Sequence, residues 1–213
     1  ITLTTFEKEY SKSEMSYGKN LLTLKVALKF INNFLDTEIA IITKAEKNGQ
    51  PVIIKALEQE LETLVTLGTE KIKIKGKADR IDSIGNVIRI VDYKTGLVQN
   101  KELKLDNWED ICTESVLAKS FQLLMYAFMY QRMNPNITEN IQSGIITFRE
   151  LSVGLKTVKV NNNELLNDTI LNEFELQLKQ LLKDIFDPAI PFSQTSELAN
   201  CEYCSFKGIC NRA

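Results

Sequence analysis

The sequence predicts an α/β (α+β) fold in which helices flank a mixed central β-sheet. Two runs, Lys71–Lys75 and Val87–Val91, alternate between apolar and polar residues as strands do. Apolar residues recur at helical spacing in three other stretches, and the predicted elements follow the order α, β, β, β, α, β, β, α. The 213 residues are 44% hydrophobic and 25% charged, which is typical of a soluble globular protein with a substantial core.

The N-terminal part predicts a helix and then a strand. Between Ser16 and about Asn48, one helical face carries Leu21, Leu24, Leu28, Ile31, Leu35 and Ile39. Gly49-Gln50-Pro51 ends this helix. A strand is expected at Val52–Leu67, where Glu58, Glu60 and Glu62 alternate with apolar residues.

The next stretch, Gly76 to Gly96, reads GKADRIDSIGNVIRIVDYKTG and predicts a β-hairpin turning at Gly85-Asn86. We expect its first strand to end near Asp79. Side chains two residues apart in a strand point to the same face. Asp92 and Lys94 should therefore project together, Tyr93 should point to the opposite face, and Asp79 should reach the same place from the neighbouring strand.

Two converging carboxylates repel each other unless a cation lies between them. Oxygen ligands of this kind suit Mg²⁺ or Mn²⁺, and a lysine beside such an ion can position water or steady charge on a phosphoryl group. The pattern is therefore typical of metal-assisted phosphodiester hydrolysis. A second interpretation is an ordinary hairpin with a solvated charged face, on which Arg80 and Asp82 simply pair.

The remaining elements complete the predicted sheet. Leu97 to Ser115 is polar and irregular, and a helix is expected from about Ser115 to Met133. Ile141–Arg149 and Leu155–Val160 predict a β pair. An amphipathic helix is expected from Asn163 to the residue before Asp187-Pro188.

The composition restricts the possible chemistry and partners. The chain has no histidine, which excludes Ser-His-Asp and Cys-His catalysis and histidine-ligated zinc. A formal net charge of −2 gives no support to nucleic-acid binding over the whole surface. Contact with DNA would need a local patch, and the candidates are Lys71, Lys73, Lys75 and Lys77, or Lys101 and Lys104. These lysines could equally belong to a solvated strand edge.

GKADRID, a short turn and IRIVDYKTG resemble the core of the PD-(D/E)XK nucleases, and most closely the RecB-like branch with its AddB-type nuclease domains. The resemblance implies a restriction-endonuclease-like core in which Asp79 and Asp92 bind metal with the Tyr93 carbonyl, and Lys94 is catalytic. It implies a further acidic ligand before the hairpin, for which Glu58 is the candidate and Glu60 the second. The string FQLLMYAFMY resembles the family's Q-x-x-x-Y helix, so Gln122 and Tyr126 would orient the lysine or the DNA.

The C-terminal tail contains Cys201, Cys204 and Cys210 in ANCEYCSFKGICNRA. Cysteines so spaced in a cytosolic chain indicate metal or cluster ligands rather than disulfides. The tail resembles the AddB-type cysteine triad, which supplies three ligands of a [4Fe–4S] cluster. The family's fourth cysteine and a histidine motif lie upstream and are absent here. Either the chain is a fragment that starts downstream of them, which the abrupt N-terminus favours, or Cys112 is the fourth ligand.

The resemblance implies a Mg²⁺-dependent exonuclease domain of a helicase–nuclease that processes DNA ends for recombinational repair. Its partners would be DNA and a helicase region or partner subunit, and its location cytoplasmic. We expect a helical segment (residues 1–50), a nuclease core (51–192) and a cysteine-rich tail (193–213), with the cluster absent or incomplete in this fragment. Two alternatives stay open: an inactive DNA-binding or docking module, and a stand-alone exonuclease of the CRISPR-adaptation type.

Overall fold

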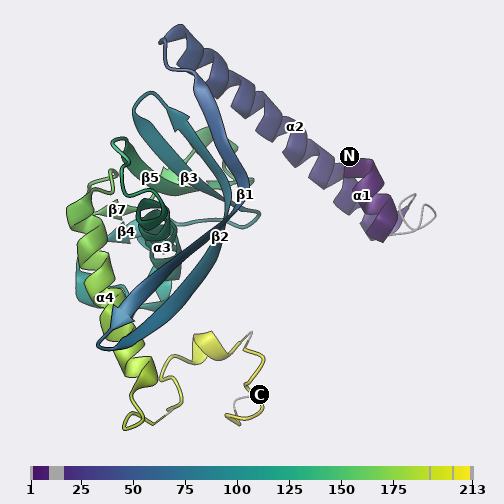
Figure 1. The fold of residues 1–213 in the computed structure, drawn as a ribbon. Helices are drawn as coiled ribbons and strands as arrows, with labels where there is room; N and C mark the ends of the chain where they lie inside the picture. Colours follow the sequence, from purple (N-terminus) through teal and green to yellow (C-terminus); the bar gives the residue numbers. More distant parts are fainter. Residues whose placement is uncertain (1, 10–16, 192, 203, 212–213) are drawn as a thin grey trace. The chain divides into compact units, whose positions relative to one another are not determined.

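A mixed five-stranded sheet is the main feature of the computed structural model, which describes residues 2–9, 17–191, 193–202 and 204–211 (Figure 1). Its strand order is β1-β2-β3-β5-β6. The β2–β3 and β5–β6 pairs are antiparallel, and β3 and β5 are parallel. The strands are β1 (Val52–Leu67), β2 (Glu70–Ile84), β3 (Val87–Lys94), β5 (Asn140–Thr147) and β6 (Lys156–Thr157). The predicted α/β class and mixed sheet are confirmed.

Among the described residues, the α-helices are α1 (Thr2–Glu9), α2 (Gly18–Lys47), α3 (Ala118–Met133) and α4 (Asp168–Phe186). A second, two-stranded sheet pairs β4 (Lys104–Leu105) with β7 (Lys159–Val160). Short 3-10 helices lie at Asn100–Leu103, Trp108–Asp110, Ser115–Leu117, Leu151–Val153 and Leu198–Cys201. Among the described residues, no helix has the length and apolar character needed to cross a membrane.

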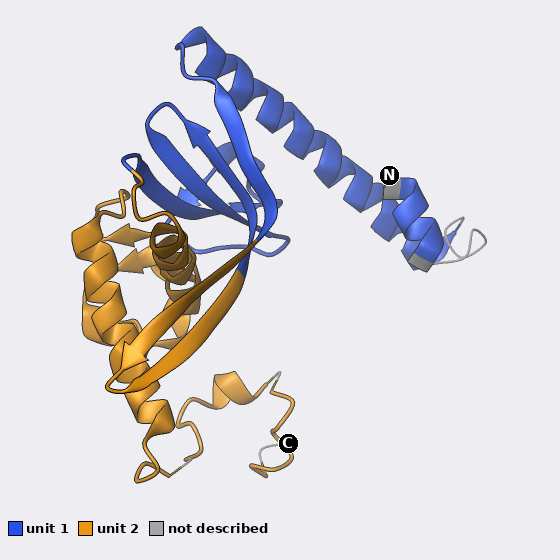
Figure 2. Ribbon diagram, in the orientation of Figure 1, with its two compact units in different colours: residues 1–59, 77–99, 138–157 blue, residues 60–76, 100–137, 158–213 orange. Residues whose placement is uncertain are grey.

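The chain divides into two compact units (Figure 2). Unit 1 comprises residues 1–59, 77–99 and 138–157, and unit 2 comprises residues 60–76, 100–137 and 158–213. Unit 1 has a core of Val91, Ile146 and Leu151, against which Phe34, Tyr93, Phe148 and Leu155 pack. In unit 2, the Phe174 ring of α4 packs on Phe121 and Phe128 of α3, with centroid distances of 5.4 and 6.1 Å. The predicted division into residues 1–50, 51–192 and 193–213 stays a prediction, and residue 192 lies outside the described residues.

The hairpin turns at Gly85-Asn86 as predicted, and Gly85 has a φ of 56°, which glycine adopts without strain. The expectation that its first strand ends near Asp79 is wrong, because β2 continues to Ile84. Arg80 to Ile84 pair with Val91 to Val87, and Ile81 and Asp82 are fully buried. Charged residues such as Arg80 and Asp82 are usually exposed to solvent. Here they are buried together with oppositely charged partners, Glu38 and Arg89.

The inward face of α2 also differs from the prediction. Leu24 is buried, whereas Leu35 and Ile39 are exposed by 50% and 63%. The half-buried Phe34 and Glu38 face inward instead. Leu21, Leu28 and Ile31 of the predicted face are half-buried, so the predicted face is right in the first half of the helix and differs only in the second. Ser16, where the predicted helix begins, lies outside the described residues.

Two later boundaries need correction. The predicted strand Leu155–Val160 is split between β6 and β7, which belong to different sheets. The helix expected from Asn163 begins at Asp168, where Asn167 caps it by accepting a hydrogen bond from the Ile170 N–H at 3.0 Å. Leu166 fits the apolar spacing of the helix but precedes its first residue. Its side chain is nevertheless buried.

Candidate active site

Asp92 and Lys94 project from the same face of β3. The Lys94 Nζ lies 2.9 Å from the Asp92 Oδ2. Asp92 is only 4% exposed, whereas the Lys94 side chain is 35% exposed. Tyr93, between them, points to the opposite face, where its ring contacts Phe34 and Phe148. The predicted arrangement of these side chains is therefore present, with the lysine accessible to water.

Asp79 joins this pair from β2. It precedes Arg80, whose register partner is Val91, so it lies beside Asp92 at the end of the paired stretch. Its Oδ2 accepts a hydrogen bond from the backbone N–H of Tyr93 at 2.8 Å. That bond ties the Asp79 carboxylate to the strand that carries Asp92 and Lys94.

The electrostatics of Asp92 reflect this setting. Burial raises the pKa of its carboxyl group, and the nearby Asp79 charge adds to the rise while Lys94 opposes it. A buried carboxylate beside another negative charge is stabilised by a cation. Asp79 and Asp92 therefore have the donor chemistry that a hard divalent cation requires.

Glu58 is not brought into this group. Its carboxylate pairs with Lys77 at 2.6 Å, and its side chain is 65% exposed. Its φ of 52° is unusual for a residue within a strand. Over the described residues, no three acidic or cysteine side chains gather as a ready metal site. Glu58 would have to leave Lys77 to bind a shared metal.

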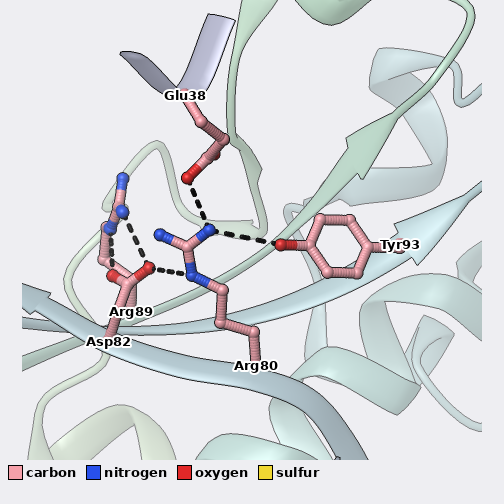
Figure 3. Close-up of polar contacts among 5 residues, drawn as sticks. All are labelled: Glu38, Arg80, Asp82, Arg89 and Tyr93. Atoms are coloured by element: carbon pink, nitrogen blue, oxygen red, sulfur yellow. Dashed lines mark hydrogen bonds and ion pairs between the residues drawn. The ribbon is translucent and has the colours of Figure 1, made fainter. Parts of the chain in front are cut away.

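The face of the hairpin opposite Asp92 carries a buried charged network (Figure 3). The Arg80 Nη1 donates to the Glu38 Oε2 of α2 at 2.6 Å and to the Tyr93 hydroxyl at 3.3 Å. The Arg80 Nε is 2.6 Å from the Asp82 Oδ2. Arg89 donates to both Asp82 oxygens, at 2.6 and 2.8 Å. Glu38, Arg80, Asp82, Arg89 and the Tyr93 hydroxyl are called the buried network below.

Sequence reasoning missed Glu38 and Arg89. Its second interpretation paired Arg80 with Asp82, which the structure shows, but on a solvated face, whereas both residues are buried. The available signal was a glutamate one helical turn after Phe34, on the face that packs inward. Burial by itself lowers the pKa of Arg80, but the hydrogen bonds to Glu38 and Tyr93 and the charge of Asp82 outweigh it and raise that pKa above its ordinary value. The guanidinium is therefore charged inside the protein.

Gln122 and Tyr126, both on α3, belong to unit 2. The Gln122 Nε2 donates to the Tyr126 hydroxyl at 2.7 Å, so they share a face as predicted. Gly76, also in unit 2, lies close to the Tyr126 ring. A Cβ at Gly76 would be 2.6 Å from the Met129 Cε and 3.1 Å from the Tyr126 Cε1. The glycine thus allows β2 to approach α3 closely.

The cysteines form no disulfide, and the part of the tail that the structure describes does not gather them as a metal site. Cys201 is buried, and Cys204 and Cys210 are half-buried in successive turns. The Cys112 Sγ lies 3.9 Å from the Gln177 carbonyl oxygen, and burial and the charge of Asp184 raise the pKa of its thiol. The expected [4Fe–4S] cluster therefore stays a prediction.

The candidate DNA-contacting lysines are partly neutralised. Lys73 pairs with Glu62 at 2.8 Å, Lys77 with Glu58, and Lys104 with Asp106 at 2.9 Å. The exposed pairs Glu58–Lys77 and Glu62–Lys73 across β1 and β2 are called the exposed ladder below. It resembles a solvated strand surface more than a basic DNA-binding patch.

Comparison with known proteins yields one family match. The model of the PD-(D/E)XK nuclease superfamily matches residues 3–211. No curated protein matches. A solved structure described as "Crystal structure of SSO0001" is 19% identical, with 97% of this chain and 79% of that chain covered, at a TM-score of 0.43. That similarity is too low to inform the fold or the function.

Proposed function

We propose, from the premise that the chain belongs to the PD-(D/E)XK nuclease superfamily, that it is the nuclease domain of a RecB/AddB-type helicase–nuclease. The proposed reaction is Mg²⁺-dependent exonucleolytic hydrolysis of DNA ends during recombinational repair. One observation carries the reaction class: Asp79, Asp92 and Lys94 lie together on one face of the β2–β3 hairpin. The RecB/AddB branch is supported by the sequence resemblance of the hairpin, the Gln122/Tyr126 helix and the cysteine tail.

In this proposal Asp79, Asp92 and the Tyr93 carbonyl hold Mg²⁺ or Mn²⁺, with Glu58 as a further ligand. When bound, the ion supplies Lewis-acid stabilisation of the phosphoryl group and lowers the pKa of attacking water. The two aspartates suit it because Asp92 is buried beside Asp79, and its pKa is raised for that reason. Glu58 contributes only after its carboxylate leaves Lys77.

Lys94 orients the attacking water and faces the charge that develops on the phosphate. Its accessible Nζ already contacts the Asp92 Oδ2, so one side chain can bridge the metal-binding carboxylate and solvent. Gln122 and Tyr126 orient Lys94 or the DNA strand in this scheme. Their mutual hydrogen bond supports a shared role.

The remaining parts of the proposal concern the larger protein. A helicase region or partner subunit would deliver the DNA end, in the cytoplasm. Cys201, Cys204 and Cys210 would hold a [4Fe–4S] cluster once further ligands are supplied. The division into residues 1–50, 51–192 and 193–213 belongs to this scheme.

The test is a degradation assay of linear duplex and single-stranded DNA by the full-length protein with Mg²⁺, Mn²⁺ or EDTA. We expect metal-dependent loss of DNA ends, and at least a roughly 1,000-fold loss of activity in Lys94→Ala and Asp92→Ala, since each removes a group that acts on the reacting phosphate. Glu139→Gln, which changes a partly exposed ion pair with Lys55 in unit 1, is the control and should cleave normally. Unchanged degradation by Lys94→Ala would overturn the proposal. A parent protein that degrades no DNA with either metal would favour a DNA-binding or docking module.

A further inference from the structure

We propose that Glu38 of α2 is a positioning residue for the candidate active site. This inference rests on the proposed function, because it concerns where Asp79, Asp92 and Lys94 are held. Glu38 lies 42 residues before Arg80 in the chain and contacts it at 2.6 Å in the folded unit. Through Arg80 and Tyr93, Glu38 fixes the two strand segments that carry the candidate catalytic side chains.

The argument begins with the alternation of side chains along a strand. Arg80 directly follows Asp79, and Tyr93 lies between Asp92 and Lys94. Neighbouring residues of a strand point to opposite faces. The buried network therefore contacts one face of each strand, and the candidate catalytic groups lie on the other face at the same positions along the strand. Any displacement of Arg80 or Tyr93 therefore displaces the backbone of Asp79, Asp92 or Lys94.

A second step concerns charge balance. The buried network contains two guanidinium groups and two carboxylates, and Arg89 uses both oxygens of Asp82. Glu38 is therefore the carboxylate that Arg80 does not share with Arg89. A neutral residue at position 38 leaves two buried guanidiniums on one carboxylate. Since arginine cannot lose its proton in a protein, Arg80 must then move toward water or draw Asp82 away from Arg89.

Tyr93 carries that movement to Asp79. Its hydroxyl accepts from the Arg80 Nη1 at 3.3 Å, and its backbone N–H donates to the Asp79 Oδ2 at 2.8 Å. Its ring is held edge-on by Phe34, one turn before Glu38 on α2, with centroids 5.5 Å apart. Helix α2 thus contacts β3 through the Phe34 ring, which packs on Tyr93, and contacts β2 through the Glu38 carboxylate, which binds Arg80. Misplacement by about 1 Å at a catalytic centre can reduce the rate roughly 100-fold.

The experiment compares Glu38→Gln with Glu139→Gln in the full-length protein. Both replace a glutamate of unit 1 that pairs with a cation, but only Glu38 belongs to the buried network. Three quantities are measured: kcat and KM for DNA with Mg²⁺, the affinity for Mn²⁺ by electron paramagnetic resonance, and the melting temperature. For Glu38→Gln we expect kcat to fall and the Mn²⁺ dissociation constant to rise, each roughly 10- to 100-fold, with KM nearly unchanged.

A purely structural role predicts something else: a lower melting temperature, but normal kcat and Mn²⁺ affinity for the folded fraction. That result would overturn the inference. Should Glu38→Gln fail to fold, Tyr93→Phe decides, because it keeps the ring packing and every charge and removes only the hydroxyl. A Tyr93→Phe variant with kcat and Mn²⁺ affinity within about twofold of the parent would then overturn it.

The two proposals can fail separately. If Lys94→Ala degrades DNA like the parent, the proposed function is wrong. Mn²⁺ affinity then decides the positioning inference by itself, because it reports on Asp79 and Asp92 whether or not the protein cleaves DNA. Weaker Mn²⁺ binding by Glu38→Gln than by Glu139→Gln supports the inference, and equal binding overturns it.

Discussion

Strand β2 contributes to two charged clusters with opposite surroundings. In the exposed ladder, the side chains of Lys73 and Glu62 are 49% and 55% exposed. In the buried network, the side chains of Arg80 and Asp82 are 6% and 0% exposed. Both clusters consist of basic and acidic side chains within hydrogen-bonding distance, so their chemistry alone does not distinguish them.

Burial decides what an ion pair contributes to stability and to geometry. Exposed pairs are screened by water and salt and contribute little to stability. A buried pair gives little net stability relative to apolar residues, but the loss of one partner leaves a desolvated charge. The buried network is therefore suited to fixing one geometry beside the candidate active site, and the exposed ladder is suited to solubility and strand register.

The largest expected effect is that of Asp82→Ala. It removes the carboxylate shared by Arg80 and Arg89, and the free energy of unfolding should fall by about 3–5 kcal/mol. Urea unfolding measures it. Asp106→Ala, which breaks the exposed pair with Lys104, is the matched control and should unfold like the parent. If the two variants lose the same stability, the distinction between buried and exposed pairs is wrong for this protein.

A smaller effect of opposite sign is expected for Asp92→Asn. The pKa of Asp92 is raised above its ordinary value of 3.8, mainly by burial, so the folded state binds this proton more tightly than the unfolded state. The stability of the parent should therefore fall as pH rises through that raised pKa, and the variant should not share this loss. In EDTA, the variant should therefore be the more stable protein at neutral pH.

Urea unfolding in EDTA at acidic and neutral pH checks this prediction. The two proteins should converge at low pH, where the aspartate is protonated in both states. A variant less stable than the parent at neutral pH would show that Lys94 more than offsets the burial of the Asp92 charge.

The smallest effect is expected for the exposed ladder. Lys73→Ala should change the melting temperature by less than about 1 °C at low salt. Even that difference should disappear in 1 M NaCl, where screening acts over about 3 Å. Calorimetry at both salt concentrations measures it. A large, salt-independent loss would mean that Lys73 has a structural role which its exposure does not reveal.

Much of the site could be predicted because its order is local. The turn at Gly85-Asn86, the common face of Asp92 and Lys94, and the opposite direction of Tyr93 follow from strand alternation and one glycine with positive φ. The Gln122–Tyr126 contact follows from the four-residue spacing of a helix. These relations need no knowledge of what packs against the element.

Other features depend on partners that are distant in the chain. In the second half of α2, Phe34 and Glu38 face inward instead of Leu35 and Ile39, because the residues packed against the helix select the face. Glu58 was placed with the aspartates, but its carboxylate pairs with Lys77. Neither outcome is encoded in the spacing around the residue concerned.

Strand spacing and composition are enough to predict the candidate reacting groups: two aspartates and a lysine, in a chain without histidine. Which charges lie in water and which are buried depends on how the elements pack together. The physical reason is that alternation assigns a side chain to a face, whereas the dielectric environment of that face depends on the element covering it. For Arg80 and Asp82 that element is α2, which also supplies Glu38 as the hydrogen-bond acceptor of Arg80.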